Sequence, residues 1–248
     1  MGSGVAAFFE IVVNWGPTLL RGALNTLALV GLCLPLVLAL AAVIGLARLS
    51  QVRVIRALAR VYVEIFRGVS LFVTIFWLYF ALPFLGISLS PWGAAVAALV
   101  LVHAAYASEY VRSTVQGVPK GQFEAARAVN MNRYQSMRYI IFPQALAAMM
   151  PLLGNELVLL LKGTSIASLI SVVELTEQGR STIMSTYLAF PTLTAVLLMY
   201  FAMAQMLTWC NRRLERRVAR WRSVAELARS LEPGLAAQLQ SRWFKVRA

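Results

Sequence analysis

The sequence lacks aspartate and has few of the other residues on which enzymes and metal sites depend. All ten acidic residues are glutamates, the only histidine is His103, and the two cysteines, Cys33 and Cys210, lie far apart. One histidine and two cysteines are too few for the usual zinc cage, and the missing aspartate excludes an aspartate-containing triad or dyad. No GxxxxGK[ST] phosphate loop occurs. We therefore expect no metal and no cofactor on this chain, and any ATP-driven work must come from a partner.

Charged residues are also scarce. They make up 13% of the 248 residues, whereas 60% are hydrophobic, and the mean hydropathy is +0.71. A soluble domain has about 25% charged residues, and this composition leaves too little polar surface to cover a soluble fold. The composition therefore predicts an integral membrane protein.

Five apolar stretches are each long enough to cross the hydrocarbon core, which takes about 20 helical residues. They lie at approximately residues 23–47, 61–82, 91–111, 146–173 and 191–210. Pro151, Gly154 and Gly163 are expected to interrupt the fourth stretch. The sequence thus predicts an all-α membrane protein with five transmembrane helices.

The basic residues alternate between the connecting segments. Residues 48–60 carry four arginines and residues 112–145 carry several basic residues, whereas residues 82–90 carry no charge. Because Lys and Arg favour the cytoplasmic side, this bias predicts an outward N-terminus and a cytoplasmic C-terminus.

The same pattern divides the chain into three parts. Residues 1–22 are expected to form a periplasmic or interfacial segment that Pro17 interrupts, and residues 23–211 to form the transmembrane domain. Residues 212–248 hold ten of the 23 basic residues and are expected to form a cytoplasmic tail. Because this tail follows a membrane span directly, we expect it to lie on anionic membrane lipid and not to bind nucleic acid.

Residues 119–143 are too polar to span and too regular for a linker. Residues 120–130 are rich in helix formers and end at an asparagine, which tolerates a left-handed helix terminus. Asn132 and Gln135 have the spacing of a capping box that starts a second helix, and Pro143 either ends this helix or begins the next span. We predict a cytoplasmic coupling segment of two short helices meeting at a sharp corner, a shape suited to docking in a groove.

This segment resembles the signature of permease subunits of ATP-binding-cassette importers, in particular those of the polar-amino-acid type. That signature reads Glu-Ala-Ala, three residues, Gly, nine residues, Ile, one residue, Leu-Pro. The chain has Glu124-Ala125-Ala126, Asn130 for Gly, Ile140, and Phe142-Pro143 for Leu-Pro. Asparagine, like glycine, tolerates a positive φ. The resemblance extends over about residues 22–217, with Val69-Ser70 where the family often has Thr-Pro and Gly163 where it often has Asp.

The resemblance implies a transport subunit without catalysis, in the inner membrane of a bacterium. Two permease subunits, identical or paralogous, would form the pore, and a periplasmic or lipid-anchored binding protein would deliver the solute. The corner would seat in a cytoplasmic ATP-binding subunit and convert its closure into opening of the pore. The residues that would couple to this ATPase are Glu124, Ala125, Ala126, Asn130, Ile140 and Pro143.

Two Glu–Arg pairs lie near the cytoplasmic ends of the second and third predicted spans. Glu64 and Arg67 are three positions apart, as are Glu109 and Arg112, so each pair shares a helix face. They are either local ion pairs whose arginines reach the headgroups or the lining of an inner gate.

Glu156 and Lys162 lie deeper, around the interrupted part of the fourth span, and are followed by Thr164 and Ser165. Broken helices in the middle of a membrane often expose polar groups to substrate in transporters, and a zwitterionic solute offers an ammonium for Glu156 and a carboxylate for Lys162. Alternatively, both charges bind the neighbouring subunit or loop carbonyls. His103 is expected to be a neutral histidine hydrogen-bonded between helices rather than part of a proton relay.

The leading hypothesis is therefore an importer permease subunit for polar amino acids. The alternative within the same class is a compatible solute such as ectoine or hydroxyectoine, because the run Phe76-Trp77-Leu78-Tyr79-Phe80 resembles a stretch of the permeases for such solutes. An intramembrane enzyme is disfavoured by the missing Asp and the single His. A passive channel is a third possibility, but it has no need of the two-helix corner.

Overall fold

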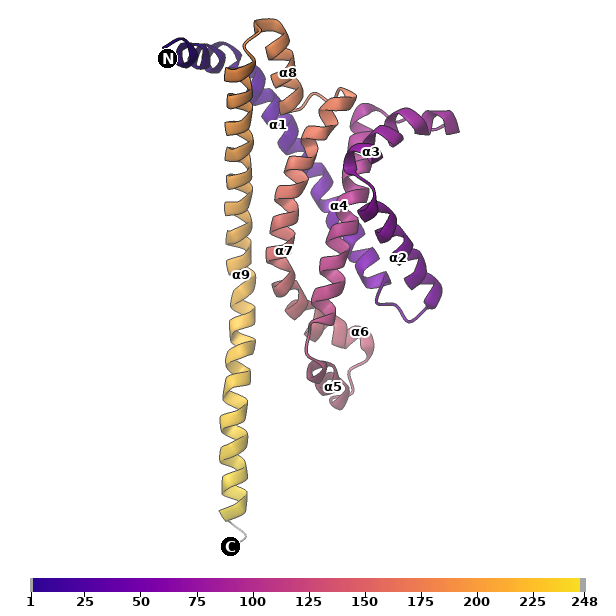
Figure 1. The fold of residues 1–248 in the computed structure, drawn as a ribbon. Coiled ribbons are helices and arrows are strands. Elements are labelled where there is room, and N and C mark those ends of the chain that lie inside the picture. The colour runs from indigo at the N-terminus through magenta and orange to yellow at the C-terminus, as the bar shows by residue number, and fades with distance from the viewer. Residues whose placement is uncertain (1, 246–248) are drawn as a thin grey trace. The chain divides into compact units, whose positions relative to one another are not determined.

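The structure is a computed structural model that describes the backbone of residues 2–245 and the side chains of residues 7–217 (Figure 1). All the regular elements in the described residues are helical. They are α1 (Gly2–Ala47), α2 (Arg53–Gly68), α3 (Leu71–Phe76), a π-helical turn η1 (Trp77–Ala81), a 3₁₀ turn η2 (Leu82–Leu85), α4 (Pro91–Gln116), α5 (Lys120–Ala128), α6 (Arg133–Gln135), a π-helical turn η3 (Ser136–Ile141), α7 (Phe142–Gly163), a 3₁₀ tract η4 (Thr164–Ile170), α8 (Leu175–Thr186) and α9 (Ala189–Lys245).

The chain divides into two compact units. The first unit consists of residues 1–113 and 152–210, and the second of residues 114–151 and 211–248. The second unit contains the predicted coupling segment. The side chains of residues 218–248 in the predicted basic tail lie outside the described residues.

Four helical stretches are long and apolar enough to cross a membrane. They are Ala7–Ala47, Pro91–Gln116, Arg133–Ile170 and Ala189–Arg217. A fifth span is present if the bent pair Arg53–Gly68 and Leu71–Leu85 is counted as one. The predicted all-α membrane protein is confirmed in this coarser form.

The second predicted span is not one straight helix. α2 ends at Gly68, and its axis makes an angle of 102° with the helical stretch that follows. Val69 and Ser70 between them have extended backbone, with ψ of 141° at both. Two consecutive extended residues break the helical hydrogen-bond ladder, so the chain turns sharply within an otherwise apolar stretch.

The predicted helix interruptions at prolines also need correction. Pro17 and Pro35 lie inside α1, and Pro151 lies inside α7, which continues through Gly154 as far as Gly163. Neighbouring helices let membrane helices tolerate such residues. Figure 1 shows the first turns of α1 running across the direction of the rest of the helix, a bend of the kind that a proline produces.

The core of the first unit depends on close helix packing through small side chains. Six alanines of α4 are fully buried, and so are Leu29 and Cys33 of α1 and Leu160 and Leu161 of α7. The alanines are Ala94, Ala95, Ala98, Ala104, Ala105 and Ala107. Small residues let membrane helices approach closely and gain van der Waals contact where lipid offers no hydrophobic drive.

A buried carboxylate joins three helices of the first unit. Glu174 is the N-cap of α8, and its side chain accepts a hydrogen bond from the backbone N–H of Glu177 (2.9 Å). It also accepts bonds from the Tyr200 hydroxyl of α9 (2.6 Å) and the Thr26 hydroxyl of α1 (3.4 Å). Glu174 has no exposed surface, so these donors replace the water that its carboxylate loses.

Candidate functional site

The corner between α5 and α6 is held by local backbone chemistry. Asn130 has a φ of 56°, in the left-handed region. Its N–H bonds the carbonyl of Arg127 (2.9 Å), and the N–H of Met131 bonds the carbonyl of Ala126 (3.0 Å). This is the Schellman arrangement, which ends α5 and satisfies two of its last carbonyls. The predicted left-handed terminus at Asn130 is therefore confirmed.

A capping box begins the next helix two residues later. The backbone N–H of Gln135 donates to the Asn132 side chain (2.8 Å), and the Gln135 side chain accepts from the backbone N–H of Asn132 (2.9 Å). The predicted box is confirmed. The helix that this box starts continues through η3 into α7. Pro143 therefore lies in the first turn of α7 and does not end the second helix of the corner.

The predicted coupling residues occupy two sides of this corner. Ala126 is fully buried and holds α5 in place, whereas Glu124, Ala125, Asn130 and Pro143 are exposed and Ile140 is half-buried. Large exposed side chains accompany them, namely Val129, Tyr134 and Tyr139. Within the same unit, the Gln144 side chain donates to the Gln122 side chain (3.3 Å) and to the carbonyl of Ile140 (3.0 Å), which ties α5 to the start of α7.

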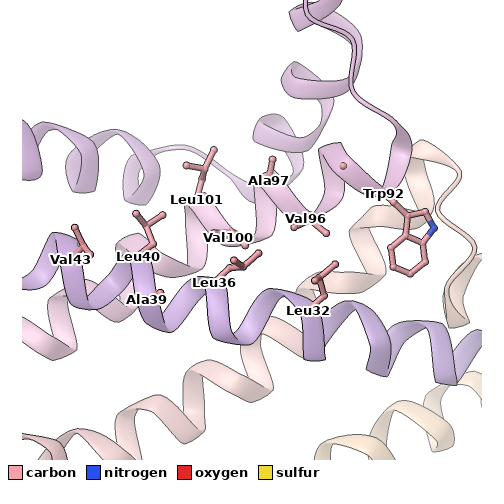
Figure 2. A pocket seen from close by; sticks show the side chains of 11 residues that line it. Leu32, Leu36, Ala39, Leu40, Val43, Trp92, Val96, Ala97, Val100 and Leu101 are labelled. Carbon is pink, nitrogen blue, oxygen red and sulfur yellow. The ribbon is translucent and has the colours of Figure 1, made fainter.

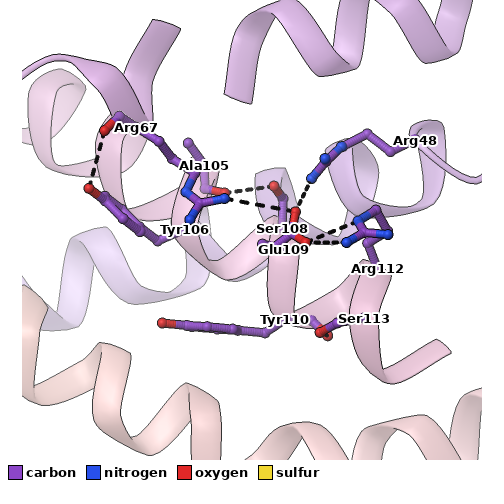
Figure 3. Close-up of polar contacts among 9 residues, drawn as sticks. All are labelled: Arg48, Arg67, Ala105, Tyr106, Ser108, Glu109, Tyr110, Arg112 and Ser113. Carbon is purple, nitrogen blue, oxygen red and sulfur yellow. Dashed lines mark hydrogen bonds and ion pairs between the residues drawn. The ribbon is translucent and has the colours of Figure 1, made fainter. Parts of the chain in front are cut away.

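A cluster of charges in the first unit centres on Glu109 of α4 (Figure 3). Its carboxylate binds Arg48, at the end of α1, and Arg112, one turn further along α4, and Arg67 of α2 lies 4.0 Å away. The four side chains carry a formal charge of +2. One carboxylate thus connects α1, α2 and α4, and truncating it would leave three cations close together without their anion.

The structure corrects one of the two predicted Glu–Arg pairs. Glu109 and Arg112 pair as expected, but no Glu64–Arg67 pair is present among the side chains described for residues 7–217. Glu64 is exposed. The Arg67 side chain instead reaches Glu109. It also lies over the ring of Tyr106, 5.4 Å from the ring centre, and the Tyr106 hydroxyl donates a hydrogen bond to the Arg67 carbonyl (3.4 Å).

The buried carboxylate of α7 has its partners on α4. One oxygen of Glu156 lies 2.7 Å from His103 Nδ1, and the other accepts a hydrogen bond from the Tyr110 hydroxyl (3.3 Å). Glu156 and His103 are 4% and 7% exposed. The predicted interhelical hydrogen bond of His103 is confirmed, and the buried charge of Glu156 has partners within its own chain.

The predicted break in the fourth span is a change of helix type rather than an unwound segment. α7 ends at Gly163 and continues as the 3₁₀ tract η4. The hydroxyls of Thr164 and Ser165 donate to the carbonyls of Leu161 (2.6 Å) and Lys162 (2.8 Å) three positions earlier. Lys162 is exposed while Glu156 is buried, so these two charges lie on different faces, as expected.

An open groove of about 820 Å³ lies between α1 and α4 of the first unit. Figure 2 shows Leu32, Leu36, Leu40 and Val43 of α1 facing Val96, Val100 and Leu101 of α4, with Trp92 at one end. All the labelled side chains are apolar apart from the indole N–H of Trp92. The groove therefore suits hydrocarbon and offers almost nothing to a polar solute.

Sequence reasoning missed the residues that complete these clusters from a distance. Arg48 lies 61 positions from Glu109, and Tyr110 lies 46 positions from Glu156. The only available signal was the cost of an unpaired charge in a membrane, which predicts that a partner exists without naming it. Within the described residues, no group of three or more His, Cys or Glu side chains is placed to hold a metal.

Comparison with known proteins gives a consistent result. The family model for the inner membrane component of binding-protein-dependent transport systems matches residues 31–220. A probable amino-acid ABC transporter permease protein of Sinorhizobium fredii is 41% identical over 187 residues, which cover 72% of this chain and 77% of that protein. The glutamine transport system permease protein of Escherichia coli is 36% identical over 206 residues, which cover 82% and 93%.

A solved structure agrees with these relatives. A chain from the crystal structure of an amino acid ABC transporter with histidines has a TM-score of 0.79 and 32% sequence identity, and the match covers 84% of this chain and 98% of that one. The predictions of a transport subunit and of a multi-pass inner-membrane location are confirmed. The chain belongs to the family of inner-membrane permease components of binding-protein-dependent transport systems.

Proposed function

We propose that this permease subunit forms the translocation path for polar amino acids together with a second permease subunit, identical or paralogous. A solute-binding protein delivers the amino acid from outside, and a cytoplasmic ATPase drives the import. The relatives and the solved structure described above are named for amino acids and for glutamine. None of these names supports the ectoine alternative.

The observation that carries the coupling proposal is the exposed corner of the second unit. Its two helices are fixed by the Schellman arrangement at Asn130 and the capping box at Asn132. Both devices are local, and the hydrogen bond from Gln144 to Gln122 adds a tie between α5 and α7, so the corner is braced to keep its angle when it transmits force. Val129, Tyr134 and Tyr139 are each about two-thirds exposed, and large exposed side chains beside a membrane span favour a protein partner.

The topology follows from the positive charges. The corner carries Lys120, Arg127, Arg133 and Arg138, and more arginines follow from Arg212. We place both in the cytoplasm, with the N-terminus outside. Residues 1–22 then form the outer segment, residues 23–211 the transmembrane domain with its coupling segment at 119–143, and residues 212–248 a tail on anionic lipid.

The polar residues of the first unit have two proposed roles. Glu156, Lys162, Thr164 and Ser165 lie along the substrate path. Glu64, Arg67, Glu109 and Arg112 belong to an inner gate, in which the bond between Glu109 and Arg48 of α1 would part or reform as the helices move. The exposed position of Lys162 leaves its ammonium available to a solute carboxylate.

The decisive experiment reverses one charge at the corner. The full transporter, with its ATPase and binding protein, is reconstituted in liposomes, and solute-stimulated ATP hydrolysis and uptake are measured for a panel of ¹⁴C-labelled amino acids. Glu124→Arg should abolish stimulated hydrolysis and co-purification with the ATPase. Glu10→Arg, which changes another exposed carboxylate, on α1, should change neither.

Two results would contradict the proposal. Uptake that continues without the ATPase, or that survives Glu124→Arg unchanged, would favour a passive channel. A wild-type transporter that carries none of the amino acids would exclude the substrate class while leaving the coupling result intact.

A further inference from the structure

A ring nitrogen buried between α4 and α7 has no partner. His103 is 7% exposed, and its Nε2 is the one buried side-chain nitrogen or oxygen without a hydrogen bond among the residues that the structure describes. A buried polar atom left unpaired costs free energy. It therefore calls for an explanation, and a functional partner that uses the atom is one.

Glu156 determines which chemistry this nitrogen presents. An ionised carboxylate only accepts hydrogen bonds, so the 2.7 Å contact requires the proton on His103 Nδ1. In a neutral imidazole with the proton on Nδ1, the other nitrogen carries a lone pair and is an acceptor. The Tyr110 hydroxyl donates to the second oxygen of Glu156, which holds the carboxylate in this orientation. With Glu156 ionised and the ring neutral, which are the states that the inference takes, His103 Nε2 presents an acceptor.

Opposite this nitrogen lies the backbone of Gly163, at the residue where α7 changes into η4. A Cβ atom added to Gly163 would lie 3.0 Å from His103 Nε2, 3.1 Å from a methyl of Leu71 and 3.3 Å from a methyl of Leu99, so the imidazole faces backbone between two leucine side chains. The neighbouring hydroxyls of Thr164 and Ser165 already donate to carbonyls of their own helix. The acceptor is thus placed where the helix changes type, next to the exposed Lys162.

We infer that His103 Nε2 is the group that accepts a hydrogen bond from an N–H donor of the transported amino acid, with Glu156 as the positioning residue behind it. This inference rests on the proposed function. It places His103 between the solute and Glu156, whose two oxygens each have a donor within the chain. Lys162 then receives the solute carboxylate from the same short stretch of chain.

The ring state can be measured directly because His103 is the only histidine in the chain. The full-length protein, carrying a tag without histidine and labelled with ¹⁵N-histidine, has two ring resonances from one site. At pH 7 we expect Nδ1 protonated and Nε2 unprotonated, and an amino acid that the transporter carries should shift Nε2 much more than Nδ1. A ring protonated at Nε2, or a spectrum that this amino acid leaves unchanged, would overturn the inference.

A matched pair of variants tests the role in transport. In His103→Asn the amide nitrogen can replace Nδ1–H and still donate to Glu156, but nothing remains at the Nε2 position. In His103→Gln the longer side chain places an amide oxygen near the Nε2 position and loses the short bond to Glu156. We expect about a tenfold loss of uptake in the Asn variant and substantially smaller loss in the Gln variant.

Which of the two variants loses more uptake shows whether His103 contacts the solute or only supports Glu156. If His103 only stabilises Glu156, the Asn variant is the milder one, and that order would overturn the inference. Thermal unfolding of both variants shows whether uptake was lost through misfolding, in which case the ring resonances of the wild type decide.

Labelled L-glutamine and L-glutamate show which donor is used. A loss for both in the Asn variant assigns the α-ammonium, and a loss for glutamine alone assigns the side-chain amide. A wild type that transports no amino acid refutes the proposed function and this inference together. A wild type that transports amino acids, with an Asn variant equal to it, refutes this inference alone.

Discussion

Glu109 of α4 binds Arg48, which lies 61 positions earlier in the chain, directly after α1. The same carboxylate binds Arg112 and lies near Arg67, so one acidic side chain determines how three helices of the first unit meet. Removing the Glu109 carboxylate should change the free energy of unfolding and the transport activity to different degrees, and the two quantities can be measured separately.

Glu109→Gln should lower the free energy of unfolding by about 1–3 kcal/mol, because it removes charged hydrogen bonds and leaves the arginines together. Glu177→Gln is the control. Glu177 also pairs with an arginine three positions later, but Arg180 is exposed, and exposed pairs contribute little to stability. A double-mutant cycle with Arg48→Met isolates the interhelical bond.

Equal effects of the two Gln substitutions on the free energy of unfolding would contradict the structural role of Glu109. Unchanged transport in Glu109→Lys, with intact expression, would refute the inner gate.

The close approach of α1 and α4 at Gly45 makes a second prediction. A Cβ on Gly45 would lie 2.6 Å from Val111 Cβ and 2.9 Å from the carbonyl oxygen of Ser108, whereas a Cβ on Gly31 would meet nothing within 4 Å. Gly45→Ala should therefore destabilise the protein by about 1–3 kcal/mol through overpacking. Gly31→Ala, in the same helix, should be neutral or stabilising by up to about 1 kcal/mol. Thermal unfolding in detergent measures both, and an equal response at the two glycines would show that the helices do not touch at Gly45.

The corner between α5 and α6 makes a third prediction. Asn130→Gly should be tolerated, because glycine adopts a positive φ freely. Asn130→Val should cost about 1–3 kcal/mol, because a β-branched residue is strained there, and it should uncouple ATP hydrolysis from uptake. Asn132→Ala should cost about 1 kcal/mol through loss of the cap. Coupled hydrolysis in the Val variant as strong as in the wild type would show that the angle of the corner has no role.

These examples indicate which features of the protein a sequence can reveal. The turn at Asn130 and the box at Asn132 and Gln135 were predictable because every partner lies within six positions. The interhelical partner of Glu109 was not, because which turn of α1 meets which turn of α4 depends on the packing of the whole unit. Local rules also failed at Pro151, where the surrounding structure keeps α7 continuous.

The second span shows another limit. Residues 61–82 are mostly apolar, and composition does not distinguish a straight helix from one that bends by 102° at Val69 and Ser70. The predicted pair of Glu64 and Arg67 assumed that both residues satisfy each other within one helix. The bend and the neighbouring α4 instead bring Arg67 to Glu109.

The buried Glu174 makes a prediction about pH, since it lies outside the spans. Burial raises the pKa of its carboxyl, and the Tyr200 hydrogen bond opposes this by stabilising the charged form. A carboxyl whose pKa is raised on folding favours the folded state in its protonated form. Its contribution is complete below the unfolded pKa of about 4.3 and is lost as the pH rises through the raised folded value.

The thermal unfolding midpoint should therefore fall with rising pH in the wild type relative to Glu174→Gln, which cannot titrate. Tyr200→Phe removes a donor that lowers the pKa, so in this variant the loss should move to higher pH. The groups that face Glu174 are the hydroxyls of Thr26, Thr176 and Tyr200 and the backbone N–H groups of Thr176 and Glu177, none of which is a cation that could reverse the sign. Parallel pH profiles for the wild type and the Gln variant would show that the Glu174 carboxyl has the same pKa in the folded and unfolded chain.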